Sequence, residues 1–245
     1  MTFAWIHPLH RLIIYFMNIT MDSVRQLLLF APPFILSLSF HEYAHAWAAN
    51  RLGDSTARYM GRLTMDPLAH ISWFGTVLFP ALAILTGVPI FFGWANPVPV
   101  DMRNFKKPRL HMAIVAAAGP FSNLVIATLS TAVLALIVKN GDSPLLSPTG
   151  PFSAFVKPAV DMIVINIHLN LFLAIFNLLP LPPLDGSRIV QGFVKSSTAE
   201  AIDKFGPQAQ MLLLILFFTG AMGVLATPVR MVLSLLLRLF GIPLG

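Results

Sequence analysis

The chain has 245 residues, of which 56% are hydrophobic and 11% are charged, and its mean hydropathy is +0.77. This composition predicts an integral membrane protein and leaves no polar stretch long enough for a separate soluble domain. The absence of cysteine excludes disulfides and thiolate metal sites. The net charge of +6 comes from basic residues in loops between apolar stretches, which indicates membrane topology and not a nucleic-acid partner.

The N-terminal residues 1–22 contain an apolar run that is too short to cross a membrane and is preceded by His7, His10 and Arg11. We expect this stretch to lie in the membrane interface as an amphipathic lead-in, with no cleavable signal peptide. An apolar helix is predicted over residues 24–50, with two prolines in its first half and a glycine stop after its end.

The predicted helix over residues 24–50 carries two histidines and a glutamate in an otherwise apolar stretch: His41, Glu42 and His45. At 3.6 residues per turn the histidines lie on one face about 6 Å apart, so both imidazoles can bind one Zn²⁺. Such a site needs a third protein ligand and keeps an open position for a water, whose pKa the metal lowers. Glu42 is then expected to act as the general base. Ionisable groups are costly in a membrane helix, which favours a functional site over a chance arrangement.

A second apolar run over residues 73–92 is interrupted by glycines and prolines, and the segment after it alternates proline and valine. Because this alternation cannot continue a helix, it predicts a short membrane-associated β element, an extended edge strand. A Pro-rich surface loop is the alternative. As an edge, the segment would pair with an extended peptide through four residues: Pro97, Val98, Pro99 and Val100.

Two further helices are predicted over residues 108–138 and 159–179. In the first, small residues over 116–119 let a neighbouring helix approach closely. Asn123 follows them at membrane depth, and it either hydrogen-bonds a neighbouring helix or belongs to a functional site. The second helix carries three asparagines on one face: Asn166, Asn170 and Asn177.

Three prolines end the helix over residues 159–179 and leave Asp185 in a Pro-Pro-Leu-Asp-Gly turn, where Gly186 permits positive φ. Asp185 is the one acidic residue that follows an apolar helix in such a turn, so we expect it to be the third zinc ligand. Weaker candidates are Asp66, Asp101 and Asp161.

The zinc site constrains the topology, because Asp185 and the two histidines must lie on the same side of the membrane. If residues 73–92 spanned the membrane, these groups would face opposite sides, so the run is predicted to be re-entrant. The loops over 51–109 and 187–207 then place ten basic residues on one side, against two in the loop before residue 159. The positive-inside rule therefore puts the active site near the cytoplasmic side.

The predicted fold is an all-α polytopic membrane protein with four to six transmembrane helices, a re-entrant segment and the short β element. All 245 residues form one domain, with the lead-in over 1–22, a catalytic core over 24–186 and C-terminal helices over 187–245. Within the last part, 187–207 is predicted to be a polar loop and 208–226 a span. Residues 229–245 form either a short last span or an interfacial helix.

The chain resembles the site-2 proteases, a family of intramembrane zinc metalloproteases, and in particular its compact prokaryotic branch without PDZ or CBS domains. The resemblance implies that His41, His45 and Asp185 bind zinc and that Glu42 is the general base. It also implies that Asn177 and Asn123 bind substrate or stabilise the oxyanion. The motifs that carry the resemblance cover most of the chain: His41-Glu42-Tyr43-Ala44-His45, Asp66-Pro67, Gly93–Val100, Ala118–Asn123 and Asn177–Gly186.

The expected function is hydrolysis of peptide bonds within or near transmembrane segments, with one Zn²⁺ per chain, in the cell membrane. The expected partners are a transmembrane peptide substrate and the lipid bilayer. Two alternatives are a zinc-binding pseudo-enzyme or assembly factor, which the intact Glu42 disfavours, and a transporter, which the lack of an inverted repeat disfavours. The sequence leaves open the oligomeric state and the roles of four histidines: His7, His10, His70 and His168.

Overall fold

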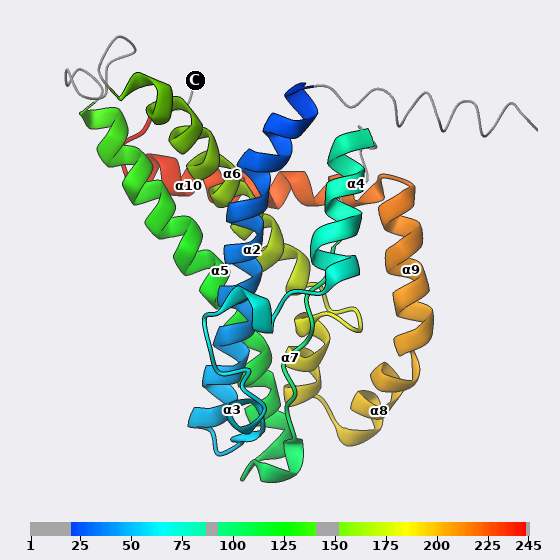
Figure 1. The fold of residues 1–245 in the computed structure, drawn as a ribbon. Helices are drawn as coiled ribbons and strands as arrows, with labels where there is room; N and C mark the ends of the chain where they lie inside the picture. Colours follow the sequence, from blue (N-terminus) through cyan, green and yellow to red (C-terminus); the bar gives the residue numbers. More distant parts are fainter. Residues whose placement is uncertain (1–20, 87–92, 141–151, 244–245) are drawn as a thin grey trace, which may run out of the picture.

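The computed structural model describes residues 21–86, 93–140 and 152–243, which are mostly helical and contain no β-strand (Figure 1). The interfacial lead-in over residues 1–22 lies almost entirely outside this part, and His7 and His10 with it. The helices are α2 (Met21–Arg51), α3 (Thr56–Tyr59), α4 (Phe79–Thr86), α5 (Pro108–Lys139), α6 (Ser153–Asn177), α7 (Asp185–Phe193), α8 (Ser196–Lys204), α9 (Gly206–Phe218) and α10 (Ala226–Leu239). Shorter turns are η1 (Pro67–Ala69), the π-helical η2 (Trp73–Leu78), η3 (Met102–Asn104) and η4 (Ala221–Leu225).

Four helical stretches of the described chain are long and apolar enough to cross a membrane: Met21–Arg51, Pro108–Lys139, Ala154–Asn177 and Ala221–Leu239. The first three confirm the long helices that hydropathy predicts, with ends shifted by a few residues. α8 and α9 add a fifth span if this pair, bent by 54°, is one broken span.

The predicted polar loop over residues 187–207 is wrong, because α7 and α8 occupy most of it. Both helices are short and amphipathic, so their polar faces dominate the sequence while a narrow apolar face packs inward. The predicted span over 208–226 is also interrupted, since α9 ends at Phe218 and Gly220 adopts a positive φ of 74°. This glycine lets the chain turn into η4 and α10.

The centre of the molecule is a bundle in which α2, α5 and α6 pack against one another, while α10 crosses behind them at a steep angle (Figure 1). Side chains from α5, α6 and α10 form the larger buried apolar cluster, which consists of Ala127, Ile167, Leu171, Val229 and Leu236. Small residues, among them the buried Ala46, Ala49 and Ala116, line α2 and α5 and permit the close approach that membrane helices use in place of a hydrophobic driving force.

A network of buried polar side chains also ties α2, α5 and α6 together. Asn123 donates from Nδ2 to Oδ1 of Asn170 over 2.7 Å, and Asn170 donates to Oγ of Ser37 over 2.8 Å. Asn170 also donates to Asn166, which in turn donates to Ser130. An unpaired polar group buried here would cost about 1–3 kcal/mol. Keeping these bonds therefore fixes how each helix is rotated about its own axis.

α7 is held against the start of α5 by Arg109. The guanidinium donates to the carbonyl oxygens of Gln191 and Val194, at the C-terminal end of α7, and to Oγ of Ser196. Gly192 allows the two helices to touch, because a Cβ there would lie 2.4 Å from Cβ of Ala113. Since α7 begins with Asp185, this contact decides where that carboxylate lies.

The segment from Gly93 to Val100 is extended and runs beside α2, but it forms no strand pairing, so the predicted β element is not confirmed. Instead, individual N–H groups of the segment donate to separate carbonyl oxygens of the surrounding chain. Trp94 donates to the carbonyl of Gly75 over 3.1 Å, and Asn96 donates to that of His70 over 2.8 Å. A regular ladder needs a donor at every second residue, and Pro97 and Pro99 remove two such donors from one edge of the segment.

Candidate metal centre and active site

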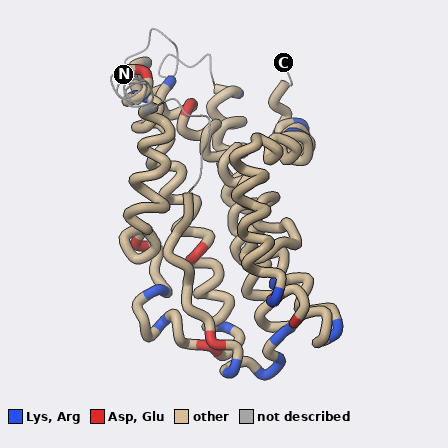
Figure 2. The backbone as a smooth tube through the Cα atoms, turned by 90° about the vertical axis from the view of Figure 1, so that its right-hand side faces the viewer, with Lys and Arg blue, Asp and Glu red and all other residues tan. Residues whose placement is uncertain are grey.

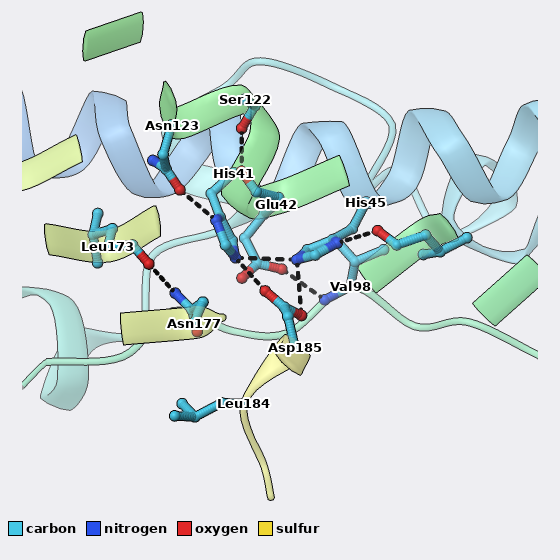
Figure 3. A network of polar contacts seen from close by, with 12 residues as sticks. His41, Glu42, His45, Val98, Ser122, Asn123, Leu173, Asn177, Leu184 and Asp185 are labelled. Atoms are coloured by element: carbon cyan, nitrogen blue, oxygen red, sulfur yellow. Dashed lines mark hydrogen bonds and ion pairs between the residues drawn. The ribbon is translucent and has the colours of Figure 1, made fainter. Parts of the chain in front are cut away.

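The two motif histidines lie on one face of α2, one helical turn apart, as their spacing predicts (Figure 3). The Nε2 atoms of His41 and His45 are 3.0 Å apart, and the rings meet edge to face at 89°. His41 is buried and His45 is nearly so. Both imidazoles therefore direct the same ring nitrogen to one point.

Asp185, the first residue of α7, meets the histidines at this point. Its Oδ2 lies 3.2 Å from Nε2 of His41, and its Oδ1 lies 3.4 Å from Nε2 of His45. The three ligand atoms lie within 4.8 Å of one another, so these residues form a group that could hold a metal ion. The structure thus brings together the three residues that the sequence proposes as ligands.

The hydrogen bond made by Nδ1 of each ring determines the tautomer, and so shows that Nε2 carries no proton. Nδ1 of His45 lies 2.8 Å from the carbonyl oxygen of Val115, an atom that only accepts, so Nδ1 carries the proton. Nδ1 of His41 lies 2.6 Å from Oδ1 of Asn123, whose Nδ2 is turned to Asn170. Neutral rings of this kind present a bare Nε2 to the centre, which is the state that binds a metal.

The chemistry of this donor set fits a zinc ion. Two bare ring nitrogens and a carboxylate repel one another unless a cation lies between them. Oδ2 of Asp185 is buried and accepts no hydrogen bond within the described part of the chain. This oxygen is therefore free to bind a cation placed between the carboxylate and the two rings.

Two glycines make room for the centre. A Cβ on Gly119 of α5 would lie 2.5 Å from Cε1 and Nε2 of His45 and 2.6 Å from Cε1 of His41. A Cβ on Gly186 would lie 2.3 Å from the carbonyl oxygens of Leu178 and Leu179. Gly186 is helical and does not use the positive φ that a glycine permits, so it is the close backbone approach that requires a glycine here.

Glu42 lies beside the histidines but takes no part in the group of three ligands. Its Oε2 accepts a hydrogen bond from the backbone N–H of Val98 over 3.0 Å (Figure 3). The extended segment with Pro97, Pro99 and Val100 therefore passes along the site on the side of Glu42. Sequence patterns give no signal for this bond, because it joins residues 56 positions apart.

The asparagines named by the family resemblance occupy different environments. Asn123 is fully buried, and its amide oxygen and nitrogen are both turned to protein partners. Asn177 is half-buried at the end of α6 and donates from Nδ2 to the carbonyl of Leu173 over 3.0 Å. The sequence places Gly119 in a run of small residues that permits close helix approach, but it does not indicate that Gly119 lies against the two ligand rings.

The weaker acidic candidates lie in other contacts. Asp66 caps η1, Asp101 bonds Arg103, and Asp161 bonds Lys157. Hydrogen bonds from Arg103 lower the pKa of the half-buried Asp101 to about 2. His70 is buried and its Nε2 lies 2.9 Å from the carbonyl of Thr64, whereas His168 is exposed on α6. None of these five residues joins the metal group.

Comparison with known proteins assigns the family. The pattern of peptidase family M50 matches residues 29–166 and 139–219. The chain belongs to peptidase family M50. These are the site-2 proteases, so the resemblance inferred from the motifs is confirmed, and the chain is a zinc metalloprotease. No solved structure matches it.

Three bacterial relatives of this M50 peptidase are named as candidate zinc metalloproteases. YwhC of Bacillus subtilis is 40% identical over 76% of this chain and 78% of its own length. Rip2 of Mycolicibacterium smegmatis is 28% identical over 83% of this chain and 74% of its own length. Rip2 of Mycobacterium tuberculosis is 28% identical over 75% of this chain and 64% of its own length.

Replacing Asp185 by alanine is expected to remove most of the zinc, because two imidazoles alone leave the site one protein ligand short. Metal analysis of the purified, dialysed M50 peptidase measures this. Asp66→Ala is the matched control, since it removes an exposed carboxylate that caps η1, and it should keep the metal. Full zinc occupancy in Asp185→Ala would show that the third ligand is another residue.

Gly119→Ala is expected to lower zinc affinity, because the added methyl group would overlap both ligand rings and push them out of register. Gly223→Ala is the control, since a Cβ there meets nothing within 4 Å. Zinc titration of both variants, with circular dichroism to confirm helix content, makes the comparison. Equal affinities in the two variants would contradict this role of Gly119.

Proposed function

We propose that this M50 peptidase hydrolyses peptide bonds within or near the transmembrane segments of other membrane proteins. The proposal rests on the position of the metal group, which lies between helices long enough to cross a membrane. A hydrolytic centre at this position can act on peptide bonds that lie within the membrane, and such peptide bonds belong to transmembrane segments. All residues assigned here lie within 24–186, which we take as the catalytic core of a single domain.

In this proposal His41, His45 and Asp185 would hold one zinc ion, which would lower the pKa of a water and polarise the scissile carbonyl group. Glu42 takes a proton from the attacking water as the water oxygen bonds to the carbonyl carbon. Glu42 then donates this proton to the amide nitrogen as the carbon–nitrogen bond breaks. Because Oε2 accepts the N–H of Val98, we assign the proton transfer to Oε1.

We assign separate roles to the two asparagines. The buried Asn123 accepts from Nδ1 of His41 and so fixes the orientation and tautomer of that ring, which supports a positioning role in place of contact with substrate. Asn177 is half-buried. It keeps the role of binding substrate or stabilising the oxyanion.

The proposed substrate is a transmembrane peptide that unwinds and lies along the segment from Pro97 to Val100, because a helix hides its carbonyl groups from attack. Pro97 and Pro99 have no N–H, and that of Val98 is donated to Glu42. These three residues can therefore offer a substrate only their carbonyl oxygens, which accept N–H groups of the unwound peptide.

The structure also bears on topology. The hydrogen bond from Trp94 to Gly75 holds both flanks of the 73–92 run together, which supports a re-entrant segment. Most Lys and Arg residues gather at the end of the molecule drawn at the bottom of Figure 2. By the positive-inside rule we assign this end to the cytoplasm, with the chain in the cell membrane. The steep crossing of α10 in Figure 1 supports an interfacial helix over a last span.

Glu42→Gln is expected to lower cleavage of single-span membrane peptides by about 10²–10⁴-fold, because the amide cannot accept a proton. Zinc content should not change, since Glu42 is not a ligand in this proposal. Glu200→Gln, which alters an exposed side chain on α8, is the matched control. A panel of such peptides, incubated with each protein with and without a zinc chelator, gives the measurement. If Glu42→Gln retained more than about a tenth of the wild-type activity, the general base would have to be another residue.

The proposed topology can be tested by cysteine labelling, because the chain has no native cysteine. Leu68→Cys and Lys106→Cys place exposed thiols on either flank of the 73–92 run, and Lys139→Cys places one at the far end of α5. We expect an impermeant reagent to reach the first two from the cytoplasmic side and the third from the other side. Labelling of Leu68→Cys and Lys106→Cys from opposite sides would show that residues 73–92 cross the membrane.

A further inference from the structure

The hydrogen bond from Val98 to Glu42 is the contact through which the extended segment meets the proposed general base. The donor is a backbone N–H, 3.0 Å from Oε2, and the contact is partly buried. Pro97 and Pro99 on either side have no N–H, so Val98 supplies the single backbone donor of this three-residue run. An N–H bond to a carboxylate is charge-assisted and stronger than a bond between neutral groups.

This bond has a clear physical consequence for Glu42. A glutamate side chain has three rotatable bonds and loses entropy whenever it is ordered. A general base must nevertheless stay within hydrogen-bond reach of the proton it removes. Holding one carboxylate oxygen on a fixed backbone donor orders the side chain and leaves the other oxygen for the reaction.

The segment is fixed on its N-terminal side by the chain around η2. The N–H groups of Trp94 and Asn96 donate to the carbonyls of Gly75 and His70, and Nδ2 of Asn96 donates to the carbonyl of Ile71 over 2.8 Å. The side chain of Thr76 in turn donates to the carbonyl of Trp94. Four hydrogen bonds thus hold the segment before it reaches Val98.

On its C-terminal side the segment is fixed by the fully buried carboxylate of Asp54. Oδ2 accepts the N–H of Asp101 over 2.8 Å, and Oδ1 accepts from Nδ2 of Asn104 over 2.7 Å and from Thr56. Burial raises the pKa of Asp54, but the hydrogen bonds from Thr56, Asn104 and Asp101 outweigh it and lower the pKa. The carboxylate therefore stays ionised, and all of these bonds are charge-assisted.

Asp54 also belongs to the end of the helix that carries Glu42. Its own N–H donates to the carbonyl of Ala49 in α2 over 2.9 Å, after a turn in which Gly53 has a φ of 111°. The segment is consequently tied to α2 at two places, through Asp54 after its end and through Val98 at Glu42. The position of the Val98 N–H relative to Glu42 is thus set by contacts with the helix that carries Glu42.

We propose that Val98 is a positioning residue whose backbone N–H holds the Glu42 carboxylate in its reactive orientation, with Asp54 anchoring the segment that carries it. This inference rests on the proposed function, in which Glu42 is the general base. It assigns to Val98 a role in the chemical step that differs from the pairing of substrate.

Val98→Pro removes the N–H, and proline suits an extended position that already precedes a proline. Val98→Ala shortens the side chain as well but keeps the N–H, so the ratio between the two variants isolates the donor. We expect kcat of Val98→Pro to be about tenfold or more below that of Val98→Ala, with KM within about twofold and zinc content equal. Equal kcat values would overturn the proposal. So would a loss confined to KM, because the N–H would then serve substrate binding.

A second measurement tests the contact without any turnover. In protein labelled with ¹⁵N-valine, the amide resonance of Val98 is the one that disappears in Val98→Ala. Glu42→Gln should shift this resonance, because a neutral amide replaces the carboxylate acceptor, and Asp54→Asn should shift it through the loosened segment. Glu200→Gln should leave it in place. An unchanged Val98 resonance in Glu42→Gln would show that the bond is absent and would overturn the proposal.

The two measurements separate this inference from the proposed function. A zinc-loaded wild-type protein that cleaves no membrane peptide would count against the proteolytic function, whereas the resonance of Val98 would still report its bond to Glu42. A cleaving enzyme with no shift in Glu42→Gln would keep the proteolytic function and remove the positioning role of Val98.

Discussion

The structure depends on bringing three electron-pair donors to one point inside a bundle of apolar helices. The bare Nε2 atoms of His41 and His45 face each other at 3.0 Å, and Asp185 adds a carboxylate at 3.2 and 3.4 Å. In surroundings of low dielectric such atoms repel one another strongly, and a divalent cation turns the repulsion into binding. The rest of the fold can be understood as the framework that holds these groups together.

Part of that framework is polar and part is a matter of space. The bonds of Asn123 and Asn170 fix the rotation of α2, α5 and α6, and the first of them also holds the ring of His41. Gly119 lets α5 pass close to both ligand rings. Arg109 holds α7 against α5, so that Asp185 reaches the histidines. In this M50 peptidase the centre is thus built from close helix packing and satisfied polar groups.

The extended segment from Gly93 to Val100 also helps to order the site, through hydrogen bonds to Glu42 and to the chain around it. It is not paired as a strand, and its donors are used one at a time on the chain around it and on Glu42. Prolines reduce the number of donors, and those that remain are therefore directed to particular acceptors. The buried Asp54 connects this segment to α2, so hydrogen bonds hold the segment beside Glu42 to the helix that carries the histidines.

The sequence by itself determined the membrane class, the three long helices and the residues that meet at the metal group, because hydropathy and the spacing of His41 and His45 depend on the geometry of single helices. A Pro-rich turn after an apolar helix was enough to single out Asp185. Only the tertiary structure decided that Asn123 faces His41, that Gly119 touches both rings and that Val98 bonds Glu42. These contacts join segments far apart in the chain, and local periodicity carries no information about which of them meet. For the same reason the β element and the loop over 187–207 were predicted wrongly or without support, since packing around each segment, and not its own composition, settles its conformation.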